Sequence, residues 1–322
     1  MKAKTIIVLL LIPLAALAQP NFKKVGSAGY VFLTIPVGAR TASMGEAAVA
    51  LSDLGPEALF VNPGSLGFSS PGQKVSFAYS PWIAETRHEA VAYVWNGGNW
   101  GFLGIGIVRL DMGEIQGYRD PPSDVLLGGA STGPKIGEYD YTGVFTADAM
   151  ALGVTYGRRL TEKFSFGVTG KFVQERIDAY ISNNIVFDGG MLYETGFGSL
   201  RVGGVVRNFG VESKYLEGVF KMPADFRFGA AMEIIGSAEA DQRVTVTTEF
   251  LHPTDNDERI NVGLEYCFDR AVFLRGGYKF FYDEESWSAG GGILWRMLSL
   301  DASYADLGRL GGNTRITLGI TL

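Results

Sequence analysis

The sequence predicts an all-β protein: a transmembrane, antiparallel up-and-down β-barrel of about fourteen strands with a small helical or irregular plug at its N-terminus. Three observations support this prediction. The chain starts with an export signal, and from residue 74 onward polar and apolar residues alternate in short runs. Short and long connections alternate between these runs, as in barrels that cross the bacterial outer membrane. We therefore expect the protein in the outer membrane of a Gram-negative bacterium, in contact with its lipid.

Residues 1–18 have the parts of a signal peptide. Two lysines precede the apolar run Ile6–Leu17, and Ala16-Leu17-Ala18 is a small-residue cleavage site. We expect the mature chain to begin at Gln19. A membrane anchor, the alternative, is disfavoured because the run is too short to cross a bilayer as a helix.

Residues 19–73 separate the signal peptide from the first alternating run. Their part 26–70 does not alternate, is rich in small residues and contains two candidate short helices, 41–51 and 56–61. A barrel of this size has a lumen that strand side chains alone cannot fill. We therefore expect 19–73 to plug the lumen; the alternative is an extension into the periplasm.

Residues 74–322 form the expected barrel. The alternation is clearest near the C-terminus, where every second residue from Ile316 to Leu322 is apolar. Successive side chains of a strand point to opposite faces, so one set meets lipid and the other a polar lumen. The expected strands are 74–83, 88–97, 100–110, 144–159, 163–178, 183–194, 199–210, 224–235, 242–252, 259–268, 271–281, 286–296, 298–306 and 313–322.

Connection lengths favour the same topology. The connections 160–162, 195–198 and 269–270 are short turns, whereas 111–143 and 211–223 fall between them and are long. A soluble β-sandwich, the alternative, has no reason to keep this order. The longest connection, 111–143, is polar and glycine-rich, and we expect it to be either an ordered functional loop or disordered.

Composition disfavours several other classes of protein. The net charge is −6 and lysine and arginine form no stripe, which argues against a nucleic-acid partner. Cys267 is the single cysteine, so the chain can form neither an internal disulfide nor a cysteine-rich metal site. The acidic run 255–258 could hold a hard cation, but a solvated loop is the simpler interpretation. We expect no metal and no cofactor.

The sequence gives little support to an enzyme. A hydrolase is the enzymatic alternative, because some outer-membrane barrels are lipases. The chain has two histidines, His88 and His252, both near expected strand ends and neither with a recognisable serine nucleophile motif. We therefore expect no catalytic residues.

Charged residues of both signs occupy positions predicted to face the lumen. They could select a solute, or they could pair with one another and with the plug, which is the simpler interpretation. Arg40 of the plug is expected to pair with an inward carboxylate such as Glu249 or Glu265. The predicted lumen-facing charged residues are Lys171, Arg201, Arg207, Arg227, Glu233, Arg243, Glu249, Glu265, Arg275 and Lys279.

The plug also carries a motif of about forty residues. It contains Ile35-Pro36-Val37-Gly38-Ala39-Arg40, then Ala42-x-Met44-Gly45, and it ends in Asn62-Pro63-Gly64-Ser65-Leu66. This stretch resembles the opening of PorV/PorQ family proteins, which belong to the FadL-like outer-membrane barrels with an N-terminal plug. The motif positions are Pro36, Gly38, Arg40, Met44, Gly45, Asn62 and Pro63. Departures from the family pattern are Glu46 in place of glycine, Gly64 in place of alanine, and Leu322 in place of a C-terminal aromatic residue.

The resemblance implies a PorV-like function. Such a protein is a non-enzymatic component of type IX protein secretion that receives exported cargo at the outer membrane, with secretion-system subunits and cargo as partners. The alternative is a FadL-like channel for uptake of small hydrophobic molecules, and a third class is a purely structural barrel. An apolar path beside the plug would favour the channel, whereas a large open mouth flanked by residues 111–143 would favour protein docking.

Overall fold

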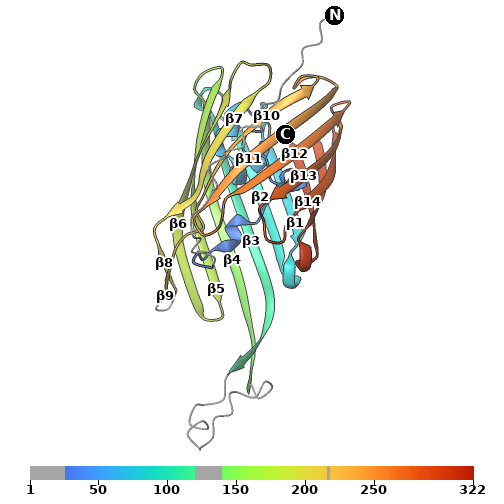
Figure 1. The fold of residues 1–322 in the computed structure, drawn as a ribbon. Coiled ribbons are helices and arrows are strands. Elements are labelled where there is room, and N and C mark those ends of the chain that lie inside the picture. The colour runs from blue at the N-terminus through green and yellow to red at the C-terminus, as the bar shows by residue number, and fades with distance from the viewer. Residues whose placement is uncertain (1–25, 120–139, 216–217) are drawn as a thin grey trace, which may run out of the picture.

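Fourteen antiparallel strands close into one barrel, which confirms the predicted fold class (Figure 1). The computed structural model describes residues 26–119, 140–215 and 218–322. The predicted signal peptide lies outside these residues, as does the middle of the connection 111–143. The barrel strands are β1 (Lys74–Pro81), β2 (Arg87–Asn96), β3 (Phe102–Arg119), β4 (Asp140–Arg159), β5 (Phe164–Ile177), β6 (Tyr180–Glu194), β7 (Arg201–Gly210), β10 (Asp225–Ile235), β11 (Gln242–Pro253), β12 (Arg259–Phe268), β13 (Val272–Phe280), β14 (Trp287–Trp295), β15 (Leu298–Asp306) and β16 (Gly312–Thr321).

The first and last strands close the barrel. Each barrel strand pairs with the next barrel strand along the chain, so that β7 pairs with β10 across the connection 211–224. Strand β1 pairs with β16 in a register that sets Lys74 opposite Thr321 and Tyr79 opposite Ile316. Closure removes the edge strands, whose unpaired backbone groups could not be satisfied in lipid. We call this β1–β16 junction the seam.

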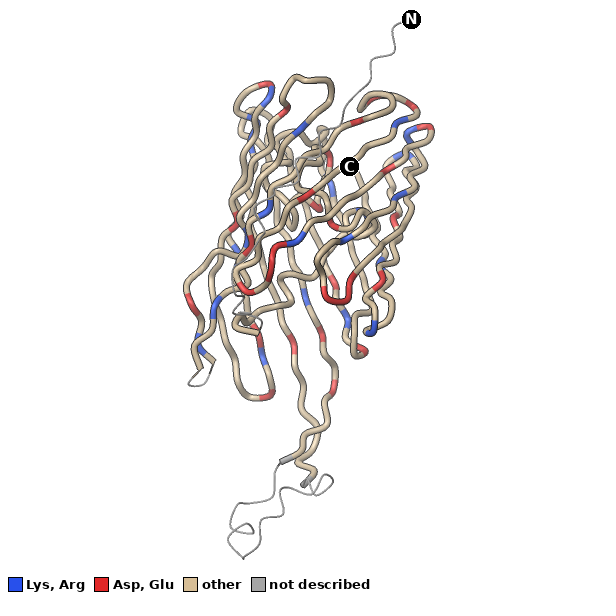
Figure 2. The backbone as a smooth tube through the Cα atoms, in the orientation of Figure 1, with Lys and Arg blue, Asp and Glu red and all other residues tan. Residues whose placement is uncertain are grey.

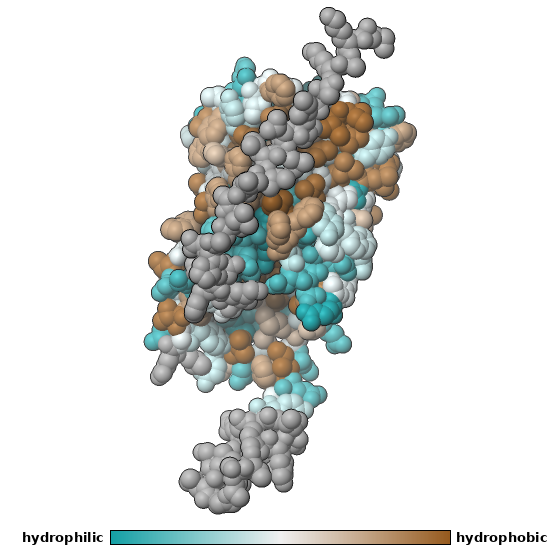
Figure 3. Space-filling view, viewed as in Figure 1, coloured by the Kyte–Doolittle hydropathy of each residue, from teal (hydrophilic) through white to brown (hydrophobic). Residues whose placement is uncertain are grey.

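The predicted alternation holds in the strands where it was clearest. In β11 the side chains of Thr245, Thr247 and Glu249 are buried on the inner face, whereas Thr248 points outward and is exposed. The outer face carries exposed apolar side chains such as Leu264 and Ile316, and Figure 3 shows many apolar residues on its visible side. An apolar outer face around a closed ladder of backbone hydrogen bonds is the structure of an outer-membrane barrel. The protein is therefore located in the outer membrane.

Among the described residues, no helix is both long enough and apolar enough to cross a membrane.

The expectation of a loop over residues 111–143 is wrong at both of its ends. Strand β3 continues to Arg119 and β4 begins at Asp140, so the two form a hairpin that projects well beyond the other strands (Figure 1). The pairing continues through Glu114 with Thr146 and Tyr118 with Tyr141, although the register shifts twice. These shifts and the glycines hide the alternation from a reading of the sequence, while the backbone ladder itself persists.

The other connections extend less far than the β3–β4 hairpin. We call the end from which β3 and β4 project the outer end, because longer loops face the outside in such barrels, and the opposite end the inner end. The expected connection 211–223 contains a small hairpin of β8 (Ser213–Tyr215) and β9 (Gly218–Phe220) at the outer end. Short 3-10 helices lie in other connections: η4 (Ile83–Glu85), η5 (Gly98–Trp100) and η7 (Gly308–Leu310).

Short helices and turns make up the N-terminal segment, but their bounds differ from those predicted. Its elements are η1 (Val31–Thr34), α1 (Ala39–Ser43), η2 (Gly55–Glu57), α2 (Ala58–Val61) and η3 (Pro63–Phe68). The expected helix 41–51 is wrong beyond Ser43, because Gly45 and Glu46 both adopt positive φ angles of 63° and turn the chain. A left-handed backbone conformation cannot continue a right-handed helix.

Candidate functional site

The N-terminal residues 26–73, which we call the plug, run through the barrel lumen from one end to the other. Near the outer end the Gly29 amide donates a hydrogen bond to the Lys221 carbonyl at 3.0 Å. At the inner end the Leu322 amide donates to the Gln73 carbonyl at 2.7 Å. The candidate site is therefore the part of the lumen that the plug leaves free.

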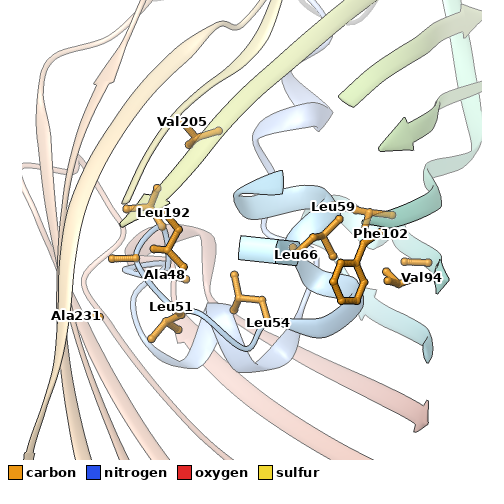
Figure 4. Close-up of a cluster of buried hydrophobic side chains, with 14 of the residues drawn as sticks. Ala48, Leu51, Leu54, Leu59, Leu66, Val94, Phe102, Leu192, Val205 and Ala231 are labelled. Carbon is orange, nitrogen blue, oxygen red and sulfur yellow. The ribbon is translucent and has the colours of Figure 1, made fainter. Parts of the chain in front are cut away.

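Apolar contacts hold the middle of the plug against the wall. Figure 4 shows Leu51, Leu54 and Leu59 of the plug in one cluster with barrel residues such as Leu192 and Val205. All members of this cluster are less than a tenth exposed. Burial of apolar area of this kind favours a plug that stays docked.

Several motif positions are set by close approach of the plug to the wall. A Cβ atom on Gly38 would lie 1.9 Å from Cδ of Glu57, so a larger residue there would have to displace the Glu57 carboxylate. Met44 is fully buried, and the Gly45 amide donates to Ser288 Oγ at 2.9 Å. These residues position the plug, and none of them offers a reactive group.

The other motif residues act in the same way. Asn62 Nδ2 donates to the Val49 carbonyl at 2.7 Å and to the Met191 carbonyl at 3.0 Å, which ties two plug segments to β6. The Pro63 carbonyl lies so close to β5 that a Cβ on Gly167 would be 2.3 Å from its oxygen. Pro36 lines the space that the plug leaves free at the outer end.

Arg40 makes the ion pair expected for it, with Glu265. Its Nε and Nη2 atoms donate to the two carboxylate oxygens at 3.0 and 3.1 Å, a two-pronged geometry that fixes direction as well as distance. Arg275 of β13 donates to the same carboxylate at 2.7 Å and also pairs with Asp301 at 2.5 Å. Arg243 approaches Glu265 at 3.8 Å.

A second ion-pair network lies nearer the outer end. Arg227 of β10 pairs with Glu249 and Asp225, both at 3.1 Å, and approaches Glu46 of the plug at 3.7 Å. Lys279 of β13 pairs with Glu46 as well, so the plug is held by charge from two strands.

The ion pairs of the remaining predicted residues run between neighbouring strands. Arg207 pairs with Asp225 at 2.6 Å and also donates to the Phe60 carbonyl of the plug at 3.0 Å. Arg201 pairs with Glu233 at 2.7 Å, and Lys171 pairs with Asp188 at 2.8 Å. Figure 2 shows charged positions along the strands themselves as well as in the connections. All ten predicted lumen-facing residues thus take part in ion pairs with the wall or the plug.

The lumen also contains polar residues that are not among the predicted ones. Asp188, Asp225 and Asp301 complete the ion pairs above, and His88 and Arg315 are buried on the inner face of β2 and β16. Asp188 and Arg315 stand at inward positions of the alternating runs in which they occur, so the alternation alone could have identified them as lumen-facing. His252 lies near the outer end of β11, where its Nδ1 is 3.2 Å from Glu258 Oε1.

The plug leaves a large cavity at the outer end. This outer cavity has a volume of about 680 Å³. Its walls combine apolar and aromatic side chains with acidic residues of the connections: Tyr30, Phe32, Trp82, Leu110, Leu251, Tyr282, Leu307, Asp255, Asp283 and Glu285. A volume of several hundred Å³ is that of a typical small-molecule site.

A smaller inner cavity of about 60 Å³ lies deeper beside the plug. Most of its lining surface is apolar and comes from the plug and the wall: Leu33, Val37, Leu59, Phe60, Val61, Val108 and Ala151. Polar residues of the wall also line it: Thr155, Thr169, Lys171, Arg207 and Asn208. Phe32, Ile35 and Pro36 line both cavities, together with the Glu46–Arg227 pair. We call these shared residues the neck, because a solute passing from one cavity to the other must move past them.

A third cavity of about 260 Å³ lies at the inner end, between the plug and strands β13 to β16. Its lining includes Glu57, whose Oε2 has no hydrogen-bond partner among the described residues. Glu57 belongs to the plug and not to the membrane-spanning strands. Burial, and next the nearby charge of Asp301, raise the pKa of its carboxyl group to about 7.

The acidic run 255–258 contributes Asp255 and Asn256 to the outer cavity. Within the described residues, no three histidine, cysteine or acidic side chains lie close enough to hold a metal ion.

Comparison with models of protein families gives no match. Comparison with curated protein sequences gives none either.

Comparison with solved structures does find similar barrels. The toluene transporter TbuX of Ralstonia pickettii has a TM-score of 0.59 at 14% sequence identity, over 88% of this chain and 98% of its own. The monoaromatic hydrocarbon channel CymD has a TM-score of 0.56 at 14% identity, over 88% and 96%. The toluene transporter TodX of Pseudomonas putida has a TM-score of 0.56 at 13% identity, over the same shares. At such low identity the likeness concerns the fold alone: this chain shares the barrel fold of these transporters and channels.

Proposed function

We propose that this protein is a non-enzymatic channel that takes up small hydrophobic molecules through its outer-membrane barrel. The observation that carries the proposal is the outer cavity of about 680 Å³, which meets the apolar inner cavity at the neck. The similar solved structures are described as transporters or channels of toluene and other monoaromatic hydrocarbons, which supports the same class of solute.

The lining favours a neutral solute. Arg227, Glu46 and Asp225 at the deep side of the outer cavity are already bound to one another or to Lys279 and Arg207. A charged solute would have to break these buried pairs to reach the inner cavity, which is costly. A neutral apolar molecule needs only the apolar faces of Phe32, Ile35 and their neighbours.

Uptake of radiolabelled toluene by cells that express the protein tests this function. Ile35→Trp replaces an aliphatic side chain at the neck with a larger indole ring. The uptake rate should fall several-fold, while the amount of folded protein stays the same. Leu264→Trp, the matched control, puts the same ring on the exposed outer face of β12 and should leave uptake unchanged. Equal uptake by cells with and without the protein would contradict the proposal.

A second candidate is the PorV-like role in type IX protein secretion. The observation that favours it is the β3–β4 hairpin, which projects beyond the outer end and offers backbone edges that neither β2 nor β5 covers. Unpaired edges of this kind bind extended segments of other proteins. Isolation of the tagged protein from its native outer membrane separates the two candidates: secretion subunits or cargo should co-purify only if this role is correct.

A further inference from the structure

Arg315 of β16 is a buried cation with two unpartnered hydrogen-bond donors. Its side chain is 1% exposed, and neither Nε nor Nη2 has a partner among the described residues. These two atoms form one edge of the guanidinium group, from which two parallel N–H bonds can reach a single anion. Buried polar groups in native proteins are almost always satisfied, so an unpartnered arginine edge needs an explanation.

A second unpartnered group lies on the same part of the wall. His88 of β2 is 2% exposed, and its Nε2 has no partner among the described residues. His88 stands opposite Ser80 of β1, and Ser80 bonds across the seam to Asn313 of β16 at 2.9 Å. Arg315 lies two residues from Asn313 on the same inward face and interacts electrostatically with His88.

Trp82 lies over the guanidinium group of Arg315, whereas no described residue accepts a hydrogen bond from its Nε–Nη2 edge. The ring centroid of Trp82 lies 5.9 Å from the guanidinium carbon, which is a weak contact at this distance. Trp82 also lines the outer cavity, together with Leu110 and Leu307. Arg315 and His88 therefore each neighbour a residue of that cavity wall, Arg315 through Trp82 and His88 through Leu110, which stands opposite it in the ladder.

No carboxylate of the described chain neutralises Arg315 by direct contact. Glu46, Glu57 and Glu285 act on it electrostatically, but Glu46 and Glu285 are both bound to Lys279, and the Glu57 carboxylate packs on Gly38. His88 adds no negative charge. An isolated charge in a dry site is strongly destabilising unless an ion of opposite sign accompanies it.

We propose that Arg315 and His88 bind a small monovalent anion at the seam. The anion accepts hydrogen bonds from Nε and Nη2 of Arg315 and from Nε2 of His88, in the histidine tautomer that carries its proton there. The ligand must be small because Arg315 and His88 are both almost fully buried, at 1% and 2% exposure. It must carry a single charge, because one arginine charge is to be balanced and the carboxylates of Glu46, Glu57 and Glu285 also act on this position and repel multivalent anions most strongly. Chloride and formate meet both conditions, whereas sulfate does not.

The bound anion would stabilise closure of the barrel, since β1, β2 and β16 all contribute to its surroundings. The test is the temperature at which the full-length, detergent-folded protein unfolds, measured at equal ionic strength in sodium chloride, formate, sulfate and gluconate. The midpoint should be higher by about 3 °C or more in chloride or in formate than in gluconate. Sulfate stabilises folded proteins generally by exclusion from their surface, so any rise in sulfate should be the same in Arg315→Lys. A difference between the chloride and formate arms identifies which of the two anions the site prefers.

Two variants separate this site from general salt effects. Arg315→Lys keeps the charge but removes the two-pronged edge, so the anion response should disappear. Arg296→Met, the control, removes an arginine outside the lumen, between β14 and β15, and should keep the response.

Crystals grown in bromide give a readout that needs no variant. An anomalous peak within hydrogen-bond distance of Arg315 Nε and Nη2 is expected. The proposal is overturned if the midpoints in chloride and in formate equal that in gluconate and no peak appears, or if Arg315→Lys responds to chloride and formate as the unchanged protein does.

Discussion

At the residue scale, glycines set how closely the plug approaches the wall. A Cβ atom on Gly277 of β13 would lie 2.0 Å from the Gly45 nitrogen and 2.2 Å from the Met44 carbonyl carbon. Both neighbours are backbone atoms, which cannot move aside as a flexible side chain can. The adjacent Gly276 is different, because its nearest such atom is the Ser288 carbonyl oxygen at 3.9 Å.

This contrast gives a matched pair of variants. Gly277→Ala should weaken docking of the plug by about 1–3 kcal/mol, the usual cost of overpacking. The measurement is the rate of hydrogen exchange of plug amides such as those of Ala48 and Val49, which are bonded to Glu249 in the docked plug. Gly276→Ala should exchange as the unchanged protein does. Equal protection in both variants would mean that the plug does not lie against β13.

Glu57 makes docking of the plug depend on pH. Its carboxyl pKa is about 7 in the folded chain against an ordinary value of 4.5, chiefly because burial penalises the charged form. Asp301 adds to the rise, whereas Arg40, Arg275 and the Thr41 amide oppose it. A group whose pKa is raised on folding contributes its full stability below the unfolded value, and that stability is lost as pH rises through the folded value.

We therefore expect the docked plug to be most stable below about pH 4.5 and to lose up to about 3 kcal/mol as pH rises past 7. Limited proteolysis of the plug between pH 5 and pH 8.5 measures the loss. Glu57→Gln keeps the size of the side chain without its charge and should remove most of the dependence on pH. A variant that becomes protease-sensitive over the same range would show that another group is responsible.

At the scale of elements, regular strands were predictable and irregular ones were not. The bounds of β11 and β12 agree with the sequence to within a residue, because their apolar and polar residues alternate without a break. For the outer parts of β3 and β4 the sequence predicts a loop, since register shifts after Asp111 and after Gly117 interrupt that period. The helix expected over 41–51 stops at Ser43, because small residues suit close packing of a turn as well as they suit a helix.

The candidate site was predictable in kind and not in detail. Alternation identified which charged residues face inward, and the pairing of Arg40 with Glu265 was among the expected choices. The neck and the outer cavity depend on how the plug crosses the lumen, which brings Phe32 close to Arg227 although the two are far apart in sequence. Such contacts follow from the closed topology and leave no local pattern in the chain.

The plug as an element should keep the barrel closed to ions. Deleting residues 26–70 removes no strand, and the carboxylates of Glu249 and Glu265 would then face water that fills the lumen. The variant should still assemble, and its conductance in planar bilayers should rise by on the order of tenfold or more, since the lumen of such a barrel is wide. The full-length protein and Gly276→Ala serve as controls and should conduct alike. A deletion variant that conducts no more than these would show that the plug does not block the pore.

At the scale of the whole molecule, the closed ladder makes folding a property of the entire barrel. Every barrel strand is paired on both sides, and no internal disulfide contributes, because Cys267 is the only cysteine. Separating one pair of strands exposes backbone groups to which lipid or detergent cannot form hydrogen bonds. All strands should therefore separate together, and only at high temperature. The seam is the junction at which this closure can be tested, since β1 and β16 lie at opposite ends of the barrel sequence.

We expect the folded protein to migrate differently from the boiled protein on a denaturing gel. Leu318→Pro should lower the temperature at which the folded band disappears, because proline cannot donate to the ladder where Phe77 stands opposite residue 318. Leu318→Ala is the matched control: it shortens the same outward side chain, keeps the amide donor, and should shift that temperature much less. If boiled and unboiled samples of the detergent-folded protein migrate together, the closed barrel is wrong; if both variants shift equally, side-chain packing and not the seam ladder governs closure.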